Sequence, residues 1–220
     1  MKDAIKAIST GFSSVHANSQ RLTKALFWPV LVYLVLTLPS FLLHENHPGA
    51  LIASLMASLV MISIAVAVHR IILHGQGSTT DNEGWRFGSR ELLFIVNQLL
   101  MIFVVLPLVP LALVPVIGEL LFLAVAGYFL GRFALIFPGL AIDRPLGFRG
   151  SWNATKGHGL TMFLVVGALP FCIESISLGL GKIPGVTFAV AFSAPFLTVY
   201  VVAALSAAYQ VVVGPASVRA

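Results

Sequence analysis

Long runs of apolar residues with few charges alternate with short polar segments along the whole chain. A helix rises 1.5 Å per residue, so about 20 apolar residues cross a hydrocarbon core that is about 30 Å thick. Runs of this length recur six times and predict six transmembrane helices. The predicted spans cover residues 25–43, 50–68, 92–109, 116–136, 160–177 and 187–213.

The longest apolar stretch predicts two helices rather than one. Residues 92–118 carry no charge, and apolar residues continue beyond Glu119. Pro107, Pro110 and Pro115 lie in the middle of this stretch, and proline interrupts helices because it has no amide hydrogen and its ring clashes with the preceding turn. We therefore expect the third helix to end, and the fourth to begin, near these prolines.

The basic residues indicate which side of the membrane each polar segment faces. When both chain ends and every second connection are placed on one side, that side holds twelve of the thirteen lysines and arginines, and only Lys182 lies on the other. Short cytoplasmic loops of membrane proteins are rich in these residues. The pattern predicts that both termini are cytoplasmic. It also supports the helix count, because a miscount by one span would scramble the alternation.

Composition agrees with a membrane protein. Of the 220 residues, 58% are hydrophobic and only 10% are charged, whereas soluble domains are about 25% charged. The formal charge of +5 is spread between apolar runs, which favours contact with a membrane surface over nucleic acid. The first apolar run is 19 residues long and lacks a small-x-small cleavage site, so we interpret it as a retained span rather than a signal peptide.

The segment before the first span predicts a helix that lies in the membrane interface. Ile5, Ile8, Phe12 and Val15 recur at helical spacing and would form one apolar stripe. We expect residues 1–24 to form a cytoplasmic amphipathic segment. The six-helix membrane domain and a short cytoplasmic tail then cover residues 25–213 and 214–220.

Aromatic and basic residues also precede the third and the fifth spans. Such mixtures are favoured at the level of the lipid headgroups. The candidate contacts to lipids or partner proteins are Arg70, Trp85, Arg86, Arg90, Arg149, Trp152 and Lys156. Three helix pairs, each with such a lead-in, predict an all-α polytopic bundle of three hairpins with short interfacial helices.

Several short motifs resemble one family of bacterial inner-membrane proteins. The motifs are His69-Arg70, RELLF at 90–94, RFALIFPGLAID at 132–143 and SWNATKG at 151–157. The family comprises uncharacterised multi-pass proteins similar to the membrane domain attached to some glycerophosphoryl diester phosphodiesterases. The resemblance implies a six-helix domain in the bacterial inner membrane without an agreed activity. No phosphodiesterase catalytic domain accompanies it in this sequence.

Arg132 is the first candidate for a functional charge inside the membrane. It follows Glu119 by 13 residues, about 20 Å along a helix, so it is expected to lie short of the cytoplasmic boundary. One interpretation pairs it with Glu91 or with a lipid phosphate. The alternative is that its side chain extends to the headgroups.

Glu119 and Glu174 are further candidates, since both are expected near the opposite face. Together they would provide two carboxylates for a proton or cation path. The alternative is that each ends its helix at water. The connection between the first and second spans contains His44-Glu45-Asn46-His47. These residues are too few to form a closed metal site, so we expect neither a metal nor a cofactor.

Pairs of small residues predict close helix packing. Gly127 and Gly131 form a G-x-x-x-G motif, and Ala203 and Ala207 share the same spacing. These surfaces would serve either packing within the bundle or contact between copies of the chain.

Three functions follow from these features. The first is a non-catalytic membrane protein that binds lipids or partner proteins at the cytoplasmic face, since no catalytic or nucleotide-binding motif occurs. The second is a small transporter or permease component that uses Arg132, Glu119 and Glu174. The third is a membrane enzyme acting on lipid headgroups.

Overall fold

The fold is described by a computed structural model that covers residues 1–43, 47–74, 88–114, 117–183 and 186–214. These residues form helices and no strands. Six helical segments are long and apolar enough to cross a membrane. They cover Ser19–Leu42, Pro48–His74, Ser89–Leu113, Ile117–Ala141, Gly159–Gly181 and Thr187–Val213. The all-α architecture with six spans is confirmed.

Several spans combine more than one helical element. The elements in chain order are α1 (Lys2–Ala17), α2 (Ser19–Leu42), α3 (Pro48–His74), α4 (Ser89–Val105), the 3-10 helix η2 (Leu106–Leu113), α5 (Ile117–Phe133), α6 (Ile136–Ala141), α7 (Gly147–Ala154), α8 (Gly159–Met162), the π-helix η3 (Phe163–Ala168), α9 (Leu169–Gly181) and α10 (Thr187–Val213). The predicted break between the third and fourth spans is confirmed. α4 ends at Val105, and the 3-10 turn that follows carries Pro107 and Pro110.

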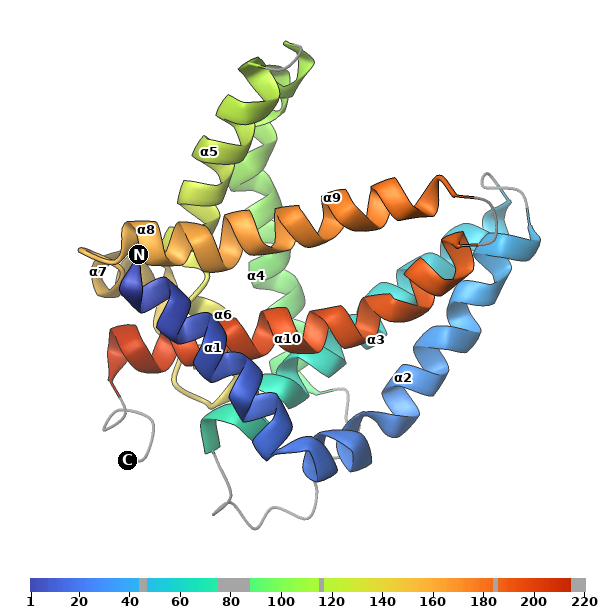
Figure 1. The fold of residues 1–220 in the computed structure, drawn as a ribbon, viewed down its shortest axis with the longest axis horizontal. Helices are drawn as coiled ribbons and strands as arrows, with labels where there is room; N and C mark the ends of the chain where they lie inside the picture. Colours follow the sequence, from blue (N-terminus) through green and yellow to red (C-terminus); the bar gives the residue numbers. More distant parts are fainter. Residues whose placement is uncertain (44–46, 75–87, 115–116, 184–185, 215–220) are drawn as a thin grey trace.

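The helices pack most closely at one end of the molecule, which we call the packed end. There α6, α7 and α8 meet the ends of α1, α3, α5 and α10, whereas the α4–α5 turn points away from the α2–α3 and α9–α10 turns (Figure 1). Wholly buried apolar residues such as Ile71, Leu135 and Ile136 lie at this end. By contrast, Leu113 and Leu178, near the turns, are exposed. Packing therefore weakens from one end of the spans to the other.

The N-terminal helix packs on the bundle through a face of small residues. Ala4, Ala7 and Gly11 are buried, as is Val15, whereas Ile5 is 61% exposed. This face contacts α10, and a Cβ on Gly11 would lie 2.6 Å from the Cα of Ala204. Small side chains let the two helices approach closely, so residue size rather than hydrophobicity selects the buried face. Of the apolar stripe, Val15 is buried on this face, Ile8 is half-buried, and Ile5 and Phe12 are exposed. That this helix lies in the membrane interface stays a prediction.

The boundary of the N-terminal segment also differs from the prediction. α1 stops at Ala17, and α2 already begins at Ser19, so the last residues of the predicted 1–24 segment belong to the first spanning helix. Asn18 joins the two helices and donates its side-chain amide hydrogen to the Ser14 carbonyl oxygen at 2.9 Å. The chain therefore makes an elbow directly at the start of α2.

Candidate functional site at the packed end

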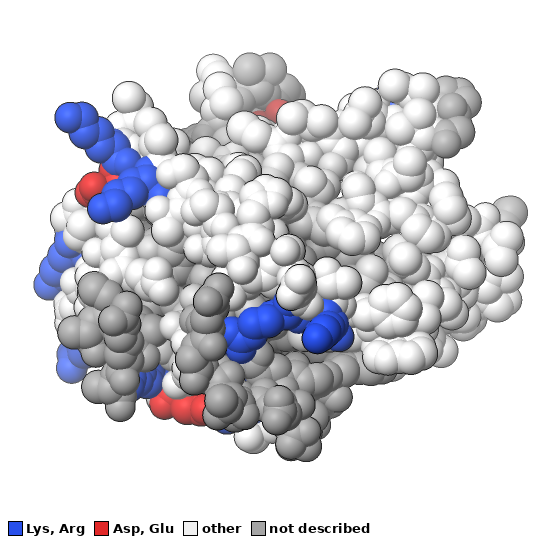
Figure 2. Space-filling view, turned by 60° about the horizontal axis from the view of Figure 1, so that its bottom comes forward, with Lys and Arg blue, Asp and Glu red and all other residues white. Residues whose placement is uncertain are grey.

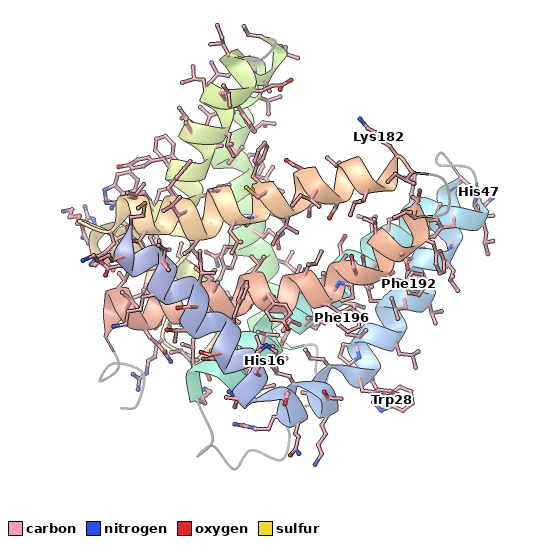
Figure 3. All side chains as sticks on the ribbon, in the orientation of Figure 1. His16, Trp28, His47, Lys182, Phe192 and Phe196 are labelled. Carbon is pink, nitrogen blue, oxygen red and sulfur yellow. The ribbon has the colours of Figure 1, made fainter. Side chains whose placement is uncertain are left out.

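The packed end also carries most of the positive charge seen on the surface. Figure 2 shows lysines and arginines along one side and the lower edge, while much of the remaining face carries no charge. Lys2, Lys6, Lys24, Arg149 and Lys156 are exposed among them. Lys182 lies at the far end of α9, well away from this group (Figure 3). The arrangement matches the alternation of basic residues along the sequence.

Arg132 lies under the half-buried ring of Trp152 and is only 5% exposed. Its guanidinium carbon is 4.4 Å from the ring centroid, and one terminal nitrogen donates to the Trp152 carbonyl oxygen at 2.7 Å. Ser151 in turn donates its hydroxyl to the Arg132 carbonyl oxygen at 2.8 Å. α7 is thereby fastened to the end of α5 by contacts in both directions.

The positive charge of Arg132 is not neutralised by a carboxylate of the described residues. Glu91, its suggested partner, instead accepts a hydrogen bond from the Gly88 amide at 2.8 Å and caps its own helix. The Nε atom of Arg132 is buried without a hydrogen-bond partner in the described part of the chain. Neither pairing with Glu91 nor extension of Arg132 to the surface is therefore what the structure shows.

An ion-pair cluster that the sequence reasoning missed joins three elements. Arg90 donates two hydrogen bonds to the Asp143 carboxylate, at 2.6 and 2.7 Å, and the nearest nitrogen of Arg70 is 3.7 Å from the same carboxylate. Arg70 also donates to the Ala141 carbonyl oxygen at 3.1 Å. Asp143 has a φ of 60°, which holds the chain in a tight turn after α6. Two of the predicted lipid contacts are thus partly engaged with the protein itself.

The neighbouring arginines lower the pKa of the Asp143 carboxyl. The hydrogen bonds from Arg90 lower the pKa of Asp143 below its usual value, and the charges of Arg90, Arg70 and His74 act in the same direction. Partial burial opposes the shift. Asp143 was visible in the sequence only as part of a motif, because nothing local indicates that residues 53 positions away supply its partner.

A second missed contact lies deeper in the bundle. The Nδ1 atom of His69 on α3 is 2.8 Å from the Ser206 hydroxyl oxygen on α10, and both residues are buried. The same hydroxyl donates to the Val202 carbonyl oxygen at 2.9 Å. A hydroxyl has one hydrogen, so His69 is the donor and carries its proton on Nδ1. This bond links the second and sixth spans.

The remaining predicted positions are distributed over several surfaces. Glu119 and Glu174 are exposed on α5 and α9, and neither shares a described contact with Arg132. Arg149 and Lys156 stay exposed at the packed end. Trp85 and Arg86 lie outside the described residues.

The pairs of small residues are used within the chain. A Cβ on Gly127 would meet the Phe163 ring at 2.9 Å, and one on Gly131 would meet the Met162 backbone at 3.0 Å. Ala203 and Ala207 are buried and belong to the alanine-rich part of α10. Of the two interpretations, packing inside the bundle is the one observed at these positions.

An apolar groove lies beside the elbow between α1 and α2, where α2 faces α10. It encloses about 420 Å³ between α2, Val15 of α1 and the residues Phe196, Val199 and Tyr200 of α10. Its walls are almost entirely apolar. A polar hollow of about 480 Å³, lined by Ser19, Gln20, Thr23 and Lys24, adjoins its end and shares two residues with it. The groove was not predicted, because it depends on how α1 and α10 lie beside α2.

Comparison of the chain with protein-family models, with curated proteins and with solved structures finds no match in any of the three. The likeness to the membrane domain of glycerophosphoryl diester phosphodiesterases therefore rests on the short sequence motifs alone.

Proposed function

We propose that this chain is a non-catalytic integral membrane protein that binds an anionic phospholipid in the groove beside the α1–α2 elbow. In this proposal the packed end faces the cytoplasm of a bacterial cell, and the protein lies in the inner membrane. The observation that carries the proposal is the apolar groove with a polar, lysine-bearing mouth.

The dimensions of the groove suit one acyl chain. Along α2 it extends from Ser19 to Leu34, about 22 Å at 1.5 Å per residue. One leaflet accounts for about half of a 30 Å hydrocarbon core. A chain that enters at the Ser19 end can therefore stay in contact with the groove through the depth of its leaflet.

The charge and polarity at the mouth suit a phosphate headgroup. Lys24 is exposed there, and Ser19, Gln20 and Thr23 add hydrogen-bonding groups. Trp28 follows Lys24 by one helical turn and projects outward from α2 (Figure 3). A tryptophan beside a lysine is typical of the boundary between headgroups and acyl chains. Each basic residue near an anionic membrane surface adds about 1 kcal/mol of attraction.

The proposal is tested by native mass spectrometry of the protein released from nanodiscs that contain equal amounts of phosphatidylglycerol and phosphatidylcholine. Lys24→Ala should reduce the retained phosphatidylglycerol, and Lys182→Ala, at the opposite end, should not. Val30→Trp should fill the groove and reduce retention of both lipids, whereas Val35→Trp, on the exposed face of the same helix, should leave it unchanged. Equal retention by all four variants, with unchanged melting temperatures, would refute the proposal.

A transporter is the second candidate function. It is supported by a cavity and not by the charged residues that the sequence suggested. Arg132, Glu119 and Glu174 do not line a common cavity among those the structure describes. The favourable observation is a cavity among α2, α3, α4 and α10 that is lined in part by hydrogen-bonding side chains.

A further inference from the structure

We propose that the cavity among α2, α3, α4 and α10 is a water-filled site that binds a small uncharged solute through hydrogen bonds. The cavity encloses about 470 Å³, within the range of about 300 to 1,000 Å³ that is usual for small-molecule sites. It is separate from the lipid groove, and the inference does not depend on the proposed lipid binding.

Hydrogen-bonding side chains line part of the cavity although it lies within the spanning helices. Six of its lining residues carry hydrogen-bonding side chains: Tyr33, Thr37, Ser54, Ser58, Gln98 and Thr198. Ser58 and Gln98 lie about 15 and 14 Å from the starts of α3 and α4, at 1.5 Å per residue. That depth is near the centre of a 30 Å hydrocarbon core. Polar groups at this depth normally face protein or water rather than lipid.

Half of these polar side chains have no hydrogen-bond partner among the described residues. The hydroxyls of Thr37, Ser54 and Ser58 donate to carbonyl oxygens of their own helices at 2.8 to 3.0 Å. Their oxygen atoms remain able to accept. Tyr33, Gln98 and Thr198, by contrast, form no side-chain hydrogen bond within the described part of the chain. The carboxamide of Gln98 is exposed to the cavity and offers both donors and an acceptor.

The lining residues specify the chemical class of the occupant. None of them is charged, so the cavity provides no counter-charge for an ion. Glu174, on α9, does not line the cavity. Donors and acceptors without formal charge match a polyol or another neutral solute with several hydroxyl or amide groups.

The cavity is closed toward the packed end by aromatic side chains. Phe94 lines it and is buried, and its ring lies 6.0 Å from that of His69 and 4.8 Å from that of Phe137. The other end of the cavity reaches Thr37 and Ser54, near the α2–α3 turn. We infer that access is from the α2–α3 turn, on the side opposite the packed end.

Cysteine labelling tests whether the cavity holds water. In a Cys172→Ala background, Ser58→Cys and Gln98→Cys are compared with Leu55→Cys and Leu99→Cys, which lie on the same helices at similar depth and are 64% and 51% exposed outside the cavity. A membrane-impermeant methanethiosulfonate reagent reacts with thiolates, which form only in water. We expect rapid labelling of the two cavity positions and at least tenfold slower labelling of the two controls.

Solute binding is tested by protection of the Ser58→Cys thiol. Glycerol and glucose serve as uncharged probes, with acetate and tetramethylammonium as charged counterparts. We expect an uncharged probe to slow labelling several-fold, and the charged probes to have no effect. Gln98→Leu should abolish the protection while the thiol remains reactive.

Three results would overturn the inference. Cavity thiols that label no faster than the controls would show that lipid fills the space. Disulfide-linked dimers of Gln98→Cys would show that a second copy of the chain covers it. Rapid labelling that neither uncharged probe slows would show a water-filled cavity without the proposed binding site.

Discussion

Arg132 and Arg149 lie at the packed end in different surroundings, and we expect them to contribute differently to stability. Arg132 is buried, stacks on Trp152 and donates to a backbone carbonyl oxygen. Arg149, on the same α7 helix as Trp152, is exposed. A guanidinium that stacks and forms directed hydrogen bonds is not replaced by an ammonium group of equal charge.

Arg132→Lys should therefore destabilise the protein although it keeps the charge. Loss of the stacking contact and the directed hydrogen bond is expected to lower the free energy of unfolding by about 2 kcal/mol. Arg149→Lys, the matched control, should change it by less than about 0.5 kcal/mol. Thermal unfolding in detergent measures both. Equal stability of the two variants would contradict the structural role of the stack.

Asp143 should make stability depend on pH in the acidic range. The pKa of Asp143 is lowered in the folded protein, so the ion pairs stabilise the fold above the unfolded value of about 3.9 and are lost as pH falls through the folded pKa. Because the side chain is 58% exposed, the effect is limited to about 1 kcal/mol. Wild type should exceed Asp143→Asn in melting temperature at pH 7. The difference should begin to shrink below about pH 4 and vanish once the pH lies below the folded pKa. A difference that does not shrink as the pH is lowered below about 4, or one that Arg90→Ala does not also remove, would contradict this assignment.

At the scale of the helices, the sequence predicts what depends on local composition. Apolar run length located all six spans, and the prolines located the break between α4 and α5. The buried face of α1 was not predicted, because Ala4, Ala7 and Gly11 are buried through the close approach of α10. The Asp143 cluster, the His69–Ser206 bond and both cavities depend on helices that are distant in sequence. None of these features leaves a periodic signal in one segment.

Glycine is necessary at position 11, where α1 meets α10, and is optional at position 179 on α9. Gly11→Ala would place a Cβ 2.6 Å from the Ala204 backbone, which can move only if the helices separate. We expect a loss of about 1 to 3 kcal/mol. Gly179→Ala on α9 meets no atom within 4 Å and should stabilise the helix by up to about 1 kcal/mol. Melting temperatures of the two variants should therefore move in opposite directions, and a stabilising Gly11→Ala would disprove the close approach.

At the scale of the whole molecule, the basic residues predict an orientation in the membrane. The α1 helix and the end of α10 lie at the packed end, whereas Lys182 and His47 lie at the far turns (Figure 3). Cysteines introduced at Lys182 and His47 should react with an impermeant reagent added to intact cells. Cysteines at Lys2 and Arg149 should react only after the cells are opened. The reverse pattern would show that the protein is inserted with its basic end outside.

The divergence of the α4–α5 hairpin links the shape of the protein to the thickness of its membrane. The uncharged helix α10 has 27 residues, about 40 Å at 1.5 Å per residue, which exceeds a 30 Å hydrocarbon core. Such a helix must lean, and a thicker bilayer lets it stand more upright. Because the spans pack most closely at the packed end, a change in lean moves their far ends the most. Acyl-chain length would then set how widely the hairpins are spread.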